Sequence, residues 1–465
     1  MKSRGYFYGG FATSLNILLY ALTFGHFLWL EGRVRGGVFR NWLRRFRYHP
    51  QKFARPRTEQ ELIDLIKNSN GIRFFGSGHS FNDGVVADVT LVSLDRYTGI
   101  TNIDDANQRM TVRAGTRVRD VVKLLLRERR WAFKALPSHD AQSIAGILST
   151  DVHGTGRDWG FVSQLVHSLK VIDGQGNVHT VGPTDDLFKA VIGGVGAAGV
   201  ISEVTVKAVP RFNIEQKFEI VDLAYVESNL DNLLLQHEHL SLYLFPFTGK
   251  CQLSTWNSTP KPKSFLGPLR EFIAISFDAL LASWFGNFMA YTGLLPALST
   301  RTHSLKRGTD LVMESNKAFN RTIYHLHQEL EFTVPYVETV QRCQDFVGLY
   351  EAMYKQKHLP YALFEVRFTP AGHDRTLIGA GRDRRSTWID LVLDDSRGFE
   401  RYYAAAEALI KQIGARPHLG KFCQDHTKAD LQNVHGAFFT QFLQLVQQYD
   451  PNGKFKNSFT RRIFF

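Results

Sequence analysis

The sequence has 465 residues, of which 44% are hydrophobic and 13% aromatic, and a formal net charge of +12. This length exceeds one ordinary core and predicts at least two domains, and the composition excludes a disordered protein. The charge invites nucleic acid as a partner, but six arginines directly follow an apolar segment, where contact with anionic lipid or a role in membrane topology explains them better. We therefore expect no nucleic acid partner. The arginines are Arg33, Arg35, Arg40, Arg44, Arg45 and Arg47.

The first predicted element is an apolar segment from Gly5 to Leu30 that contains no Asp, Glu, Lys or Arg. Its 26 residues are enough to cross a bilayer core. Basic residues after Leu30 outnumber Lys2 and Arg4, so the positive-inside rule places the body of the protein in the cytoplasm. We expect a single-pass transmembrane helix over residues 5–30 as an N-terminal membrane anchor. A signal peptide and a peripheral or buried helix are the alternatives, although no Ala-x-Ala-like site precedes the basic run.

A short connector over residues 48–57, with two prolines, precedes a regular pattern of helices and strands. Thr58 followed by three polar residues and an apolar run predicts a capped amphipathic helix. Alternation predicts strands at residues 72–75, 85–94 and 109–114, then a helix beginning at Gly115-Thr116 and a hairpin over 169–181 with an Asp-Gly turn. This order suggests an α+β nucleotide-binding unit.

The strand at 72–75 leads into the loop Gly76-Ser77-Gly78-His79-Ser80. Glycines at alternate positions permit positive φ and expose successive backbone N–H groups, so the loop can surround an anion. It is not a Rossmann fingerprint, because Phe81 occupies the position of the third glycine. A phosphate-binding loop with a histidine at its tip predicts a cofactor site with a reactive imidazole.

Two further glycine-rich stretches follow, at residues 143–156 and 192–201. Runs of small residues form where backbone lies flat against a ligand. His153 is a conceivable metal ligand, but no second histidine or carboxylate lies at a ligand spacing. No metal site is therefore expected. The three cysteines are far apart without Cys-x-x-Cys spacing, which predicts reduced, half-buried thiols.

Together the three glycine-rich stretches resemble the FAD-linked oxidases of the vanillyl-alcohol-oxidase superfamily, with a PCMH-type FAD-binding domain. Within it, the sequence is similar to the aldonolactone and alditol oxidase branch, which includes D-arabinono-1,4-lactone and L-gulono-1,4-lactone oxidases. The family's Gly-His-Ser is matched by residues 78–80 and its His-Gly-x-Gly by 153–156. Its Gly-Gly-x-Gly-x-x-Gly-x-Ile-x-Glu-Val is matched by 193–204.

The resemblance implies an α+β fold with three parts after the anchor. These are a two-subdomain FAD-binding domain over residues 48–210, an α+β substrate or cap domain over 211–415, and a C-terminal segment, 416–465, that returns to the FAD domain. It also implies FAD bonded covalently through His79, although a histidine that only hydrogen-bonds the flavin or substrate is the alternative. The implied FAD-binding residues are Gly76, Ser77, Gly78, His79, Ser80, Asn82, Ser143, Gly146, Thr150, His153, Gly154, Gly156, Gly199, Ile201 and Lys421.

Three residues in the second half of the chain are the catalytic candidates. Glu365 and Arg367 alternate on one face of a predicted strand, residues 363–369. Such a pair could be a solvated cross-strand pair, but the resemblance implies a Glu-x-Arg that binds sugar hydroxyls over the flavin. Lys421 ends Pro417-His418-Leu419-Gly420-Lys421, which is similar to the family's Pro-His-Trp-Gly-Lys with leucine in place of tryptophan. An ordinary surface lysine is the alternative for Lys421.

The implied activity is FAD-dependent oxidation of a hydroxyl on a sugar lactone or polyol, with hydride passing to flavin N5. O2, a quinone or another membrane acceptor would reoxidise the flavin. The alternatives are a membrane-associated FAD dehydrogenase acting on a lipid-linked sugar or sterol, and a tethered binding protein without flavin. Residues 279–300 lack charge and predict a helix at the membrane face, with buried core or a second span as alternatives.

Overall fold

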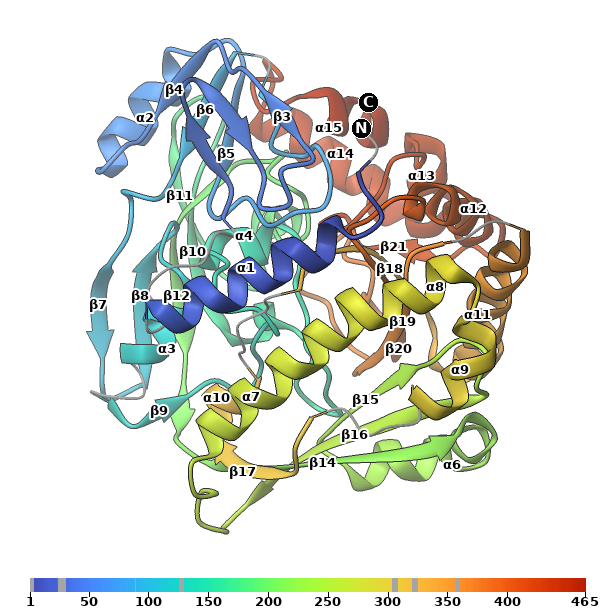
Figure 1. Ribbon diagram of the computed structural model, residues 1–465. Helices are drawn as coiled ribbons and strands as arrows, with labels where there is room; N and C mark the ends of the chain where they lie inside the picture. Colours follow the sequence, from blue (N-terminus) through green and yellow to red (C-terminus); the bar gives the residue numbers. More distant parts are fainter. Residues whose placement is uncertain are drawn as a thin grey trace.

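The computed structural model of the protein describes residues 4–23, 31–87, 89–124, 129–302, 308–319, 325–356 and 359–465. Their apolar side chains form two main cores. The first contains residues between Leu62 and Ala208 together with the C-terminal helices. The second lies between one large sheet and its helices. The cavity described below lies where these two parts of the chain face each other (Figure 1).

The first part is built on two sheets. A small parallel sheet has the strand order β4-β6-β5, and a five-stranded antiparallel sheet has the order β11-β10-β12-β8-β7. The strands are β4 (Lys52–Ala54), β5 (Ile72–Phe75), β6 (Thr90–Ser93), β7 (Ile100–Asp104), β8 (Arg109–Arg113), β10 (Val166–Ile172), β11 (Val178–Val181) and β12 (Val200–Lys207), with β9 (Trp131–Ala132) paired to β13 (Val209–Pro210). The helices are α2 (Glu59–Lys67), α3 (Val118–Leu124), α4 (Ile144–Ser149) and α5 (Asp186–Val191).

The second part is an eight-stranded sheet with the order β17-β14-β16-β15-β19-β20-β18-β21. Helices α6, α11 and α12 pack against one face and form the second core. The strands are β14 (Asn213–Asp222), β15 (His239–Leu244), β16 (Lys250–Thr259), β17 (Leu311–Glu314), β18 (His327–Pro335), β19 (Ala362–Thr369), β20 (Ser386–Asp394) and β21 (Arg416–Pro417). The helices are α6 (Leu223–Gln236), α10 (Ser315–Phe319), α11 (Thr339–Gln356) and α12 (Phe399–Gln412).

The C-terminal segment lies against the first part of the chain. The N–H of Ile72 donates to the carbonyl of Lys454 at 2.8 Å, and Asn457 Nδ2 donates to the carbonyl of Gly84 at 3.0 Å. Helices α13 (Lys428–His435), α14 (Ala437–Tyr449) and α15 (Ser458–Phe464) contribute to the first core. The sheet strand β5 and the last residues of the chain are thus neighbours, whereas the domain limits 48–210, 211–415 and 416–465 stay predictions.

Several sequence predictions are confirmed, beginning with the α+β class. Helix α2 begins where expected, and the Thr58 side chain accepts a hydrogen bond from the N–H of Glu61 at 3.1 Å. The hairpin of β10 and β11 is present. The strand expected over 85–94 is wrong in extent, because β6 covers only Thr90–Ser93. Residues 83–86 form a turn in which Val86 N–H donates to the Asp83 carbonyl.

The N-terminal prediction of a 26-residue span is not what the structure shows. Helix α1 runs over Tyr8–Leu22, 15 residues, and packs against α7 (Gly267–Leu280) and the π-helical turn Leu281–Gly286. Residues 24–30 of the expected anchor lie outside the described residues. The arginine-rich stretch that follows residue 30 is folded and is not an extended basic segment. It forms a three-stranded sheet of β1 (Arg33–Arg35), β2 (Val38–Arg40) and β3 (Arg47–Tyr48).

Among the described residues, one helix is long and apolar enough to cross a membrane by length and composition, Gly267–Thr292. It consists of α7, the π-helical turn and α8 (Asn287–Thr292), and α9 (Leu295–Thr302) follows it. In Figure 1 this helix lies beside α1 across the front of the molecule.

Candidate active site

The glycine loop and the open face of the large sheet line one cavity of about 200 Å³. Its walls come from four stretches that are far apart in the sequence: residues 72–85, 137–153, 195–201 and 418–421. Its floor consists of polar side chains from β18 and β19. The face of the sheet that the helices leave open therefore meets the three predicted glycine-rich stretches.

Close packing fixes the glycine loop against the segment that precedes α4. A Cβ on Gly76 would lie 1.8 Å from the hydroxyl oxygen of Ser143, so a side chain at Gly76 clashes with Ser143 in its present position. Gly78 has a φ of +63°, in the region that favours glycine. The Ser143 hydroxyl accepts from the N–H of Gly146 and caps α4. The loop and the start of α4 thus form one surface.

The arginine-rich stretch covers the outer side of this loop. Gly32 N–H donates to the Ser77 carbonyl at 2.7 Å, and Trp42 N–H donates to the Gly78 carbonyl at 3.1 Å. The indole of Trp42 stacks on the imidazole of His79, with ring centroids 5.4 Å apart. His79 is therefore held between the N-terminal segment and the rest of the site.

Asn82 joins the glycine loop to the loop that carries Lys421. Its Nδ2 donates to the carbonyls of Leu419, at 2.6 Å, and Lys421, at 2.8 Å, and its Oδ1 accepts from the N–H of Gly84 at 2.9 Å. Asn82 is only 2% exposed. Each buried polar atom of its side chain is satisfied, so Asn82 fixes the position of Lys421 relative to His79.

Arg367 is the centre of the cavity floor. Its NH2 group lies 2.5 Å from Glu331 Oε1 and 3.5 Å from Asp390 Oδ2. Glu365 pairs directly with Asp390 in the β19–β20 register, and Asp390 pairs with Glu331 in the β18–β20 register. The hydroxyl of Tyr243 donates to Glu365 Oε1 at 3.0 Å. As the sequence pattern predicted, Glu365 and Arg367 share one face, while Phe364 and Val366 enter the second core.

Lys421 approaches the same carboxyl groups from above the sheet. Its Nζ contacts Glu329 and lies 3.3 Å from Asp390 Oδ2 and 3.7 Å from Glu331 Oε2. Burial lowers the pKa of Lys421 to about 7. Glu329 was not anticipated as a partner of Lys421.

Burial and charge shift the pKa values of the two buried carboxyl groups in opposite directions. Burial raises the pKa of both, but the guanidinium of Arg367 and the ring of His153 hold the pKa of Glu331 below its ordinary value. Burial and the negative charge of Glu331 raise the pKa of Asp390 well above its ordinary value. Glu331 is thus the more acidic of the two carboxyl groups, and Asp390 is the one that is more readily protonated.

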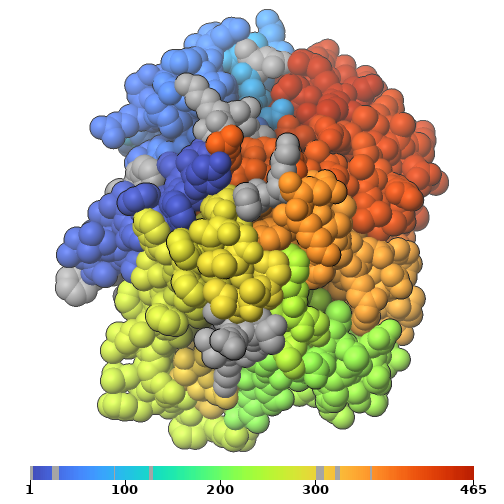
Figure 2. All heavy atoms as spheres, turned by 45° about the vertical axis from the view of Figure 1, so that its right-hand side comes forward, coloured from blue at the N-terminus to red at the C-terminus, as the bar shows by residue number. Residues whose placement is uncertain are grey.

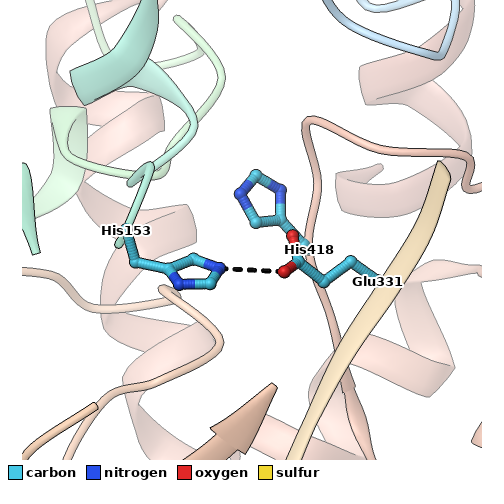
Figure 3. Close-up of side chains that lie close together, drawn as sticks. All are labelled: His153, Glu331 and His418. Atoms are coloured by element: carbon cyan, nitrogen blue, oxygen red, sulfur yellow. Dashed lines mark hydrogen bonds and ion pairs between the residues drawn. The ribbon is translucent and has the colours of Figure 1, made fainter. Parts of the chain in front are cut away.

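His153, Glu331 and His418 bring ligand-type atoms within 4.8 Å of one another (Figure 3). His153 Nε2 lies 3.1 Å from Glu331 Oε1, and its ring stacks on Trp388 with centroids 3.6 Å apart. The same carboxylate oxygen already contacts the Arg367 guanidinium, whose charge compensates it without a metal ion. Burial lowers the pKa of His153 to about 4, so its imidazole is neutral.

The structure brings most predicted site residues to this cavity. The three catalytic candidates and all the predicted FAD-binding residues except Gly154 and Gly156 line it. Gly154 lines a second cavity, and Gly156 N–H donates to the carbonyl of Phe368. The residues that sequence reasoning missed are Trp42, His139, Glu329, Glu331 and Asp390. The alternation of His327, Glu329 and Glu331 along one strand was the signal available for two of them.

The second cavity, of about 310 Å³, adjoins the first. It shares Glu329, Glu365 and Arg367 with the first cavity, and the inner side of α7 forms its opposite wall with Ile275, Asp278 and Ala279. The polar floor is therefore accessible from both cavities. The glycine-rich loops line the first cavity, and the sheet and α7 line the second.

Residues 204–463 match the family described as D-arabinono-1,4-lactone oxidase, and residues 50–182 match the family described as FAD binding domain. The first match covers more than half of the chain. The chain belongs to the D-arabinono-1,4-lactone oxidase family. It is an FAD-dependent oxidoreductase of the aldonolactone oxidase type.

Individual relatives agree with this family assignment. The chain is 27% identical over 439 residues to the L-gulono-1,4-lactone dehydrogenase of Mycobacterium tuberculosis, covering 92% of this chain and 99% of that protein. It is 24% identical to the L-gulonolactone oxidase of Bos taurus, covering 93% and 99%. It is 32% identical over 247 residues to the D-arabinono-1,4-lactone oxidase of Candida albicans, covering 49% and 44%.

Among solved structures, cholesterol oxidase from Brevibacterium sterolicum has the same fold. One crystal structure of it superposes with a TM-score of 0.74 at 17% identity, covering 93% of this chain and 98% of that one. A His121Ala mutant of the cholesterol oxidase gives a TM-score of 0.72 at 16% identity, with the same coverage. At this identity the likeness concerns the fold alone.

The first cavity fits the FAD of this oxidase family. A Cβ added to Gly196 would meet only Arg73, at 3.8 Å, so the backbone there faces open space, and at Gly146 the backbone is open apart from the Ser143 hydroxyl at 2.8 Å. Such a wall lets a planar or phosphate group approach the main chain closely. Ser77, Ser143 and the backbone of residues 76–80 are the groups that would hold the dinucleotide.

Proposed function

We propose that this protein oxidises a sugar-derived 1,4-lactone of the D-arabinono or L-gulono type at a hydroxyl-bearing carbon. The observation that carries the proposal is the floor of the cavity. Glu365, Arg367 and Lys421 meet there, beside the glycine-rich walls that fit FAD. FAD, when bound, supplies the two-electron acceptor for the substrate's C–H hydride.

The roles of the side chains are proposed from their contacts. Arg367, held by Glu331, would bind and orient substrate oxygens with its remaining N–H groups. Glu365 Oε1 already accepts from Tyr243, so its Oε2 is the carboxylate oxygen available to take the proton of the substrate hydroxyl. Lys421 Nζ would stabilise negative charge on the substrate oxygen as that proton leaves.

Steady-state assays with D-arabinono-1,4-lactone and L-gulono-1,4-lactone test the proposal. We expect Glu365→Gln and Lys421→Met each to lower kcat about 100-fold or more, the size typical for loss of a positioned acid, base or charge-stabilising group. Glu227→Gln on the exposed side of α6 is the matched control and should retain full activity. A folded, FAD-loaded protein that oxidises neither lactone would overturn the assignment. Turnover of a sterol or lipid-linked sugar instead would favour the alternative function.

We also propose that His79 bonds FAD covalently, since its ring lies on the cavity wall beside the glycine loop. Acid precipitation of the purified protein tests this. The yellow colour should stay in the pellet of the wild type and leave it in His79→Ala. Colour released from the wild type would show that His79 only contacts the flavin.

The electron acceptor is proposed to be O2 or a quinone-type membrane acceptor. Comparing O2 consumption with reduction of an artificial dye acceptor for the same lactone separates an oxidase from a dehydrogenase. The expected single-pass anchor over residues 5–30 with a cytoplasmic catalytic body stays a prediction, and a helix that lies on one leaflet is its alternative. Protease protection of tagged termini in membrane vesicles would test it.

A further inference from the structure

Helix α1 has its side chains distributed opposite to those of a helix on a water-soluble protein. The face packed on the protein carries small and polar residues, whereas the outer face carries large apolar ones. Soluble proteins place apolar side chains inward and polar ones outward. The buried residues are Gly9, Gly10, Ala12, Thr13 and Asn16. The exposed residues are Phe11, Leu15, Leu18 and Leu22, between 42% and 68% exposed.

The helix of α7 and α8 repeats this inverted distribution. Its buried residues are small or polar except for Met289; they are Gly267, Ser276, Ala282, Ser283, Gly286, Asn287, Met289 and Ala290. Its outer side exposes Leu269, Ile273, Phe277, Phe285 and Phe288, between 40% and 63% exposed. Figures 1 and 2 show the two helices side by side on one face of the molecule, α1 in dark blue and α7–α8 in yellow. The nine exposed side chains of the two helices are called the apolar face below.

The contacts between the two helices resemble those between helices inside a membrane. Trp284 Nε1 donates to the Ser14 hydroxyl at 2.9 Å, and the Ser283 hydroxyl donates to Thr13 Oγ1 at 3.3 Å. A Cβ on Gly10 would lie 2.9 Å from the Trp284 ring. Small residues and hydrogen bonds between helices are how helices associate when their outer surfaces contact lipid.

Basic side chains border the apolar face at both ends. Arg397 is exposed and lies over the ring of Tyr6, 5.2 Å from its centroid, whereas Arg4, 3.9 Å from the centroid of Tyr8, is paired with Asp395 at 2.7 Å. At the start of α7, Lys263 and Arg270 are exposed. A face of large apolar residues with cations at its border matches an anionic bilayer, with acyl chains below and headgroups at the rim.

Further arginines gather beside the N-terminal end of α1. Burial and the neighbouring charges of Arg33, Arg40 and Arg4 lower the pKa of Arg44 to about 10. Arginines that crowd one another in this way repel, and phosphate or carboxylate headgroups relieve the repulsion. Arg33, Arg40 and Arg44 of the basic stretch thus lie near the N-terminal end of α1.

The connections of α7–α8 exclude a span. The chain enters the helix from β16 and leaves it toward β17, and both strands pair with β14. A helix crossing the bilayer would place these two strands on opposite sides. Asp278, the charged residue in the middle of α7, faces inward, where it lines the second cavity and accepts from Gly308 N–H.

We propose that α1 and α7–α8 lie in the plane of one leaflet of an anionic lipid bilayer, with the apolar face among the acyl chains. The protein would then be a monotopic membrane protein. Its second cavity lies directly behind the membrane-bound helix, since α7 forms one wall of that cavity. This proposal is independent of the substrate.

Sedimentation of the full-length FAD-loaded protein with vesicles tests the surface. The vesicles contain phosphatidylcholine alone or phosphatidylcholine with about one part in four of phosphatidylserine. We expect the wild type to bind the anionic vesicles, and Leu18→Gln/Phe277→Gln to lower the partition coefficient by about tenfold or more. The matched control is Leu235→Gln/Val337→Gln, which changes two equally exposed apolar residues on α6 and the turn before α11. It should bind like the wild type.

The charge border has its own test. Arg270→Gln/Arg397→Gln should weaken binding to the anionic vesicles and leave binding to the neutral ones within about twofold. An unchanged flavin spectrum in every variant shows that the fold is intact. Equal binding by the Leu18/Phe277 variant and its control would overturn the proposal. So would a wild type that ignores vesicles and forms a dimer, by light scattering, that Leu18→Gln/Phe277→Gln dissociates, because the apolar face would then contact a second copy.

Discussion

Replacing Arg367 by methionine removes the cation from the buried carboxyl groups of the cavity floor. Arg367 NH2 lies 2.5 Å from Glu331 Oε1, and the Glu331 side chain is 0% exposed. Methionine preserves much of the volume but leaves Glu331 as a buried charge with no guanidinium beside it. Removing one partner of a buried ion pair costs about 3–5 kcal/mol. We expect Arg367→Met to lose stability of this size at pH 7.

The loss of stability in Arg367→Met should depend on pH, and the ionisation of Glu331 decides the direction of that dependence. Burial opposes ionisation, but Arg367 and His153 hold the pKa of Glu331 below its ordinary value of 4.5. In the wild type this ion pair therefore stabilises the protein above that pH, and the stabilisation is lost as pH falls. Without Arg367, burial raises the pKa above the ordinary value, so folding favours the protonated form. The difference between wild type and variant should shrink between about pH 7 and pH 5.

Urea unfolding followed by tryptophan fluorescence at both pH values measures these differences, provided that each protein shows one transition. The double variant Arg367→Met/Glu331→Gln removes both charges and should recover at least half of the loss, because Glu331 is then no longer a buried anion without its guanidinium. A cost below about 1 kcal/mol for Arg367→Met, or a double variant as unstable as the sum of the two singles, would refute the reasoning.

Three further outcomes follow from the site. Gly76→Ala should abolish flavin binding, because its Cβ would lie 1.8 Å from Ser143 Oγ. The double variant Gly76→Ala/Ser143→Gly should restore measurable flavin absorbance. A double variant without flavin would refute the steric cause. Asn82→Ala breaks three buried hydrogen bonds and should lower the free energy of unfolding by about 2–3 kcal/mol, seen as a lower urea midpoint. An unchanged midpoint contradicts the view that Asn82 joins the glycine loop to the loop of Lys421. Since burial lowers the pKa of Lys421 to about 7, kcat should fall above that pH. Lys421→Arg should flatten this fall, because arginine keeps its proton at these pH values. An identical dependence of kcat on pH in both proteins contradicts the role of the ammonium.

Local patterns in the sequence were enough for the elements that carry the chemistry. Thr58 capped α2, β5 led into the glycine loop, and alternation placed Glu365 and Arg367 on one face of β19. Each of these features depends on residues within one turn or one strand. The family motifs added the expectation that the loop, the sheet and Lys421 meet, which pattern alone does not contain.

The partners of these residues could not be predicted in the same way. Glu331 and Asp390 reach Arg367 because β18, β20 and β19 are adjacent in the sheet, although 36 and 23 positions separate them from Arg367 in the sequence. Strand order is a long-range property that periodicity does not encode. Trp42 is a similar case, because nothing in its neighbourhood indicates that the arginine-rich stretch folds over His79.

For the N-terminal segment, amino-acid composition does not decide between a membrane span and a helix that lies in one leaflet. Residues 5–30 are apolar on average. Both a membrane span and a helix lying in one leaflet require an apolar segment. The two differ in which residues face the protein. In α1 the buried positions are Gly9, Gly10, Ala12, Thr13 and Asn16, which lie on one side of the helix, and the opposite side is exposed. A spanning helix contacts lipid along its whole length, whereas a helix fixed to the protein by Thr13, Ser14 and Trp284 has only its outer stripe available. The side-chain contacts therefore favour a surface helix over the span that hydropathy alone suggested.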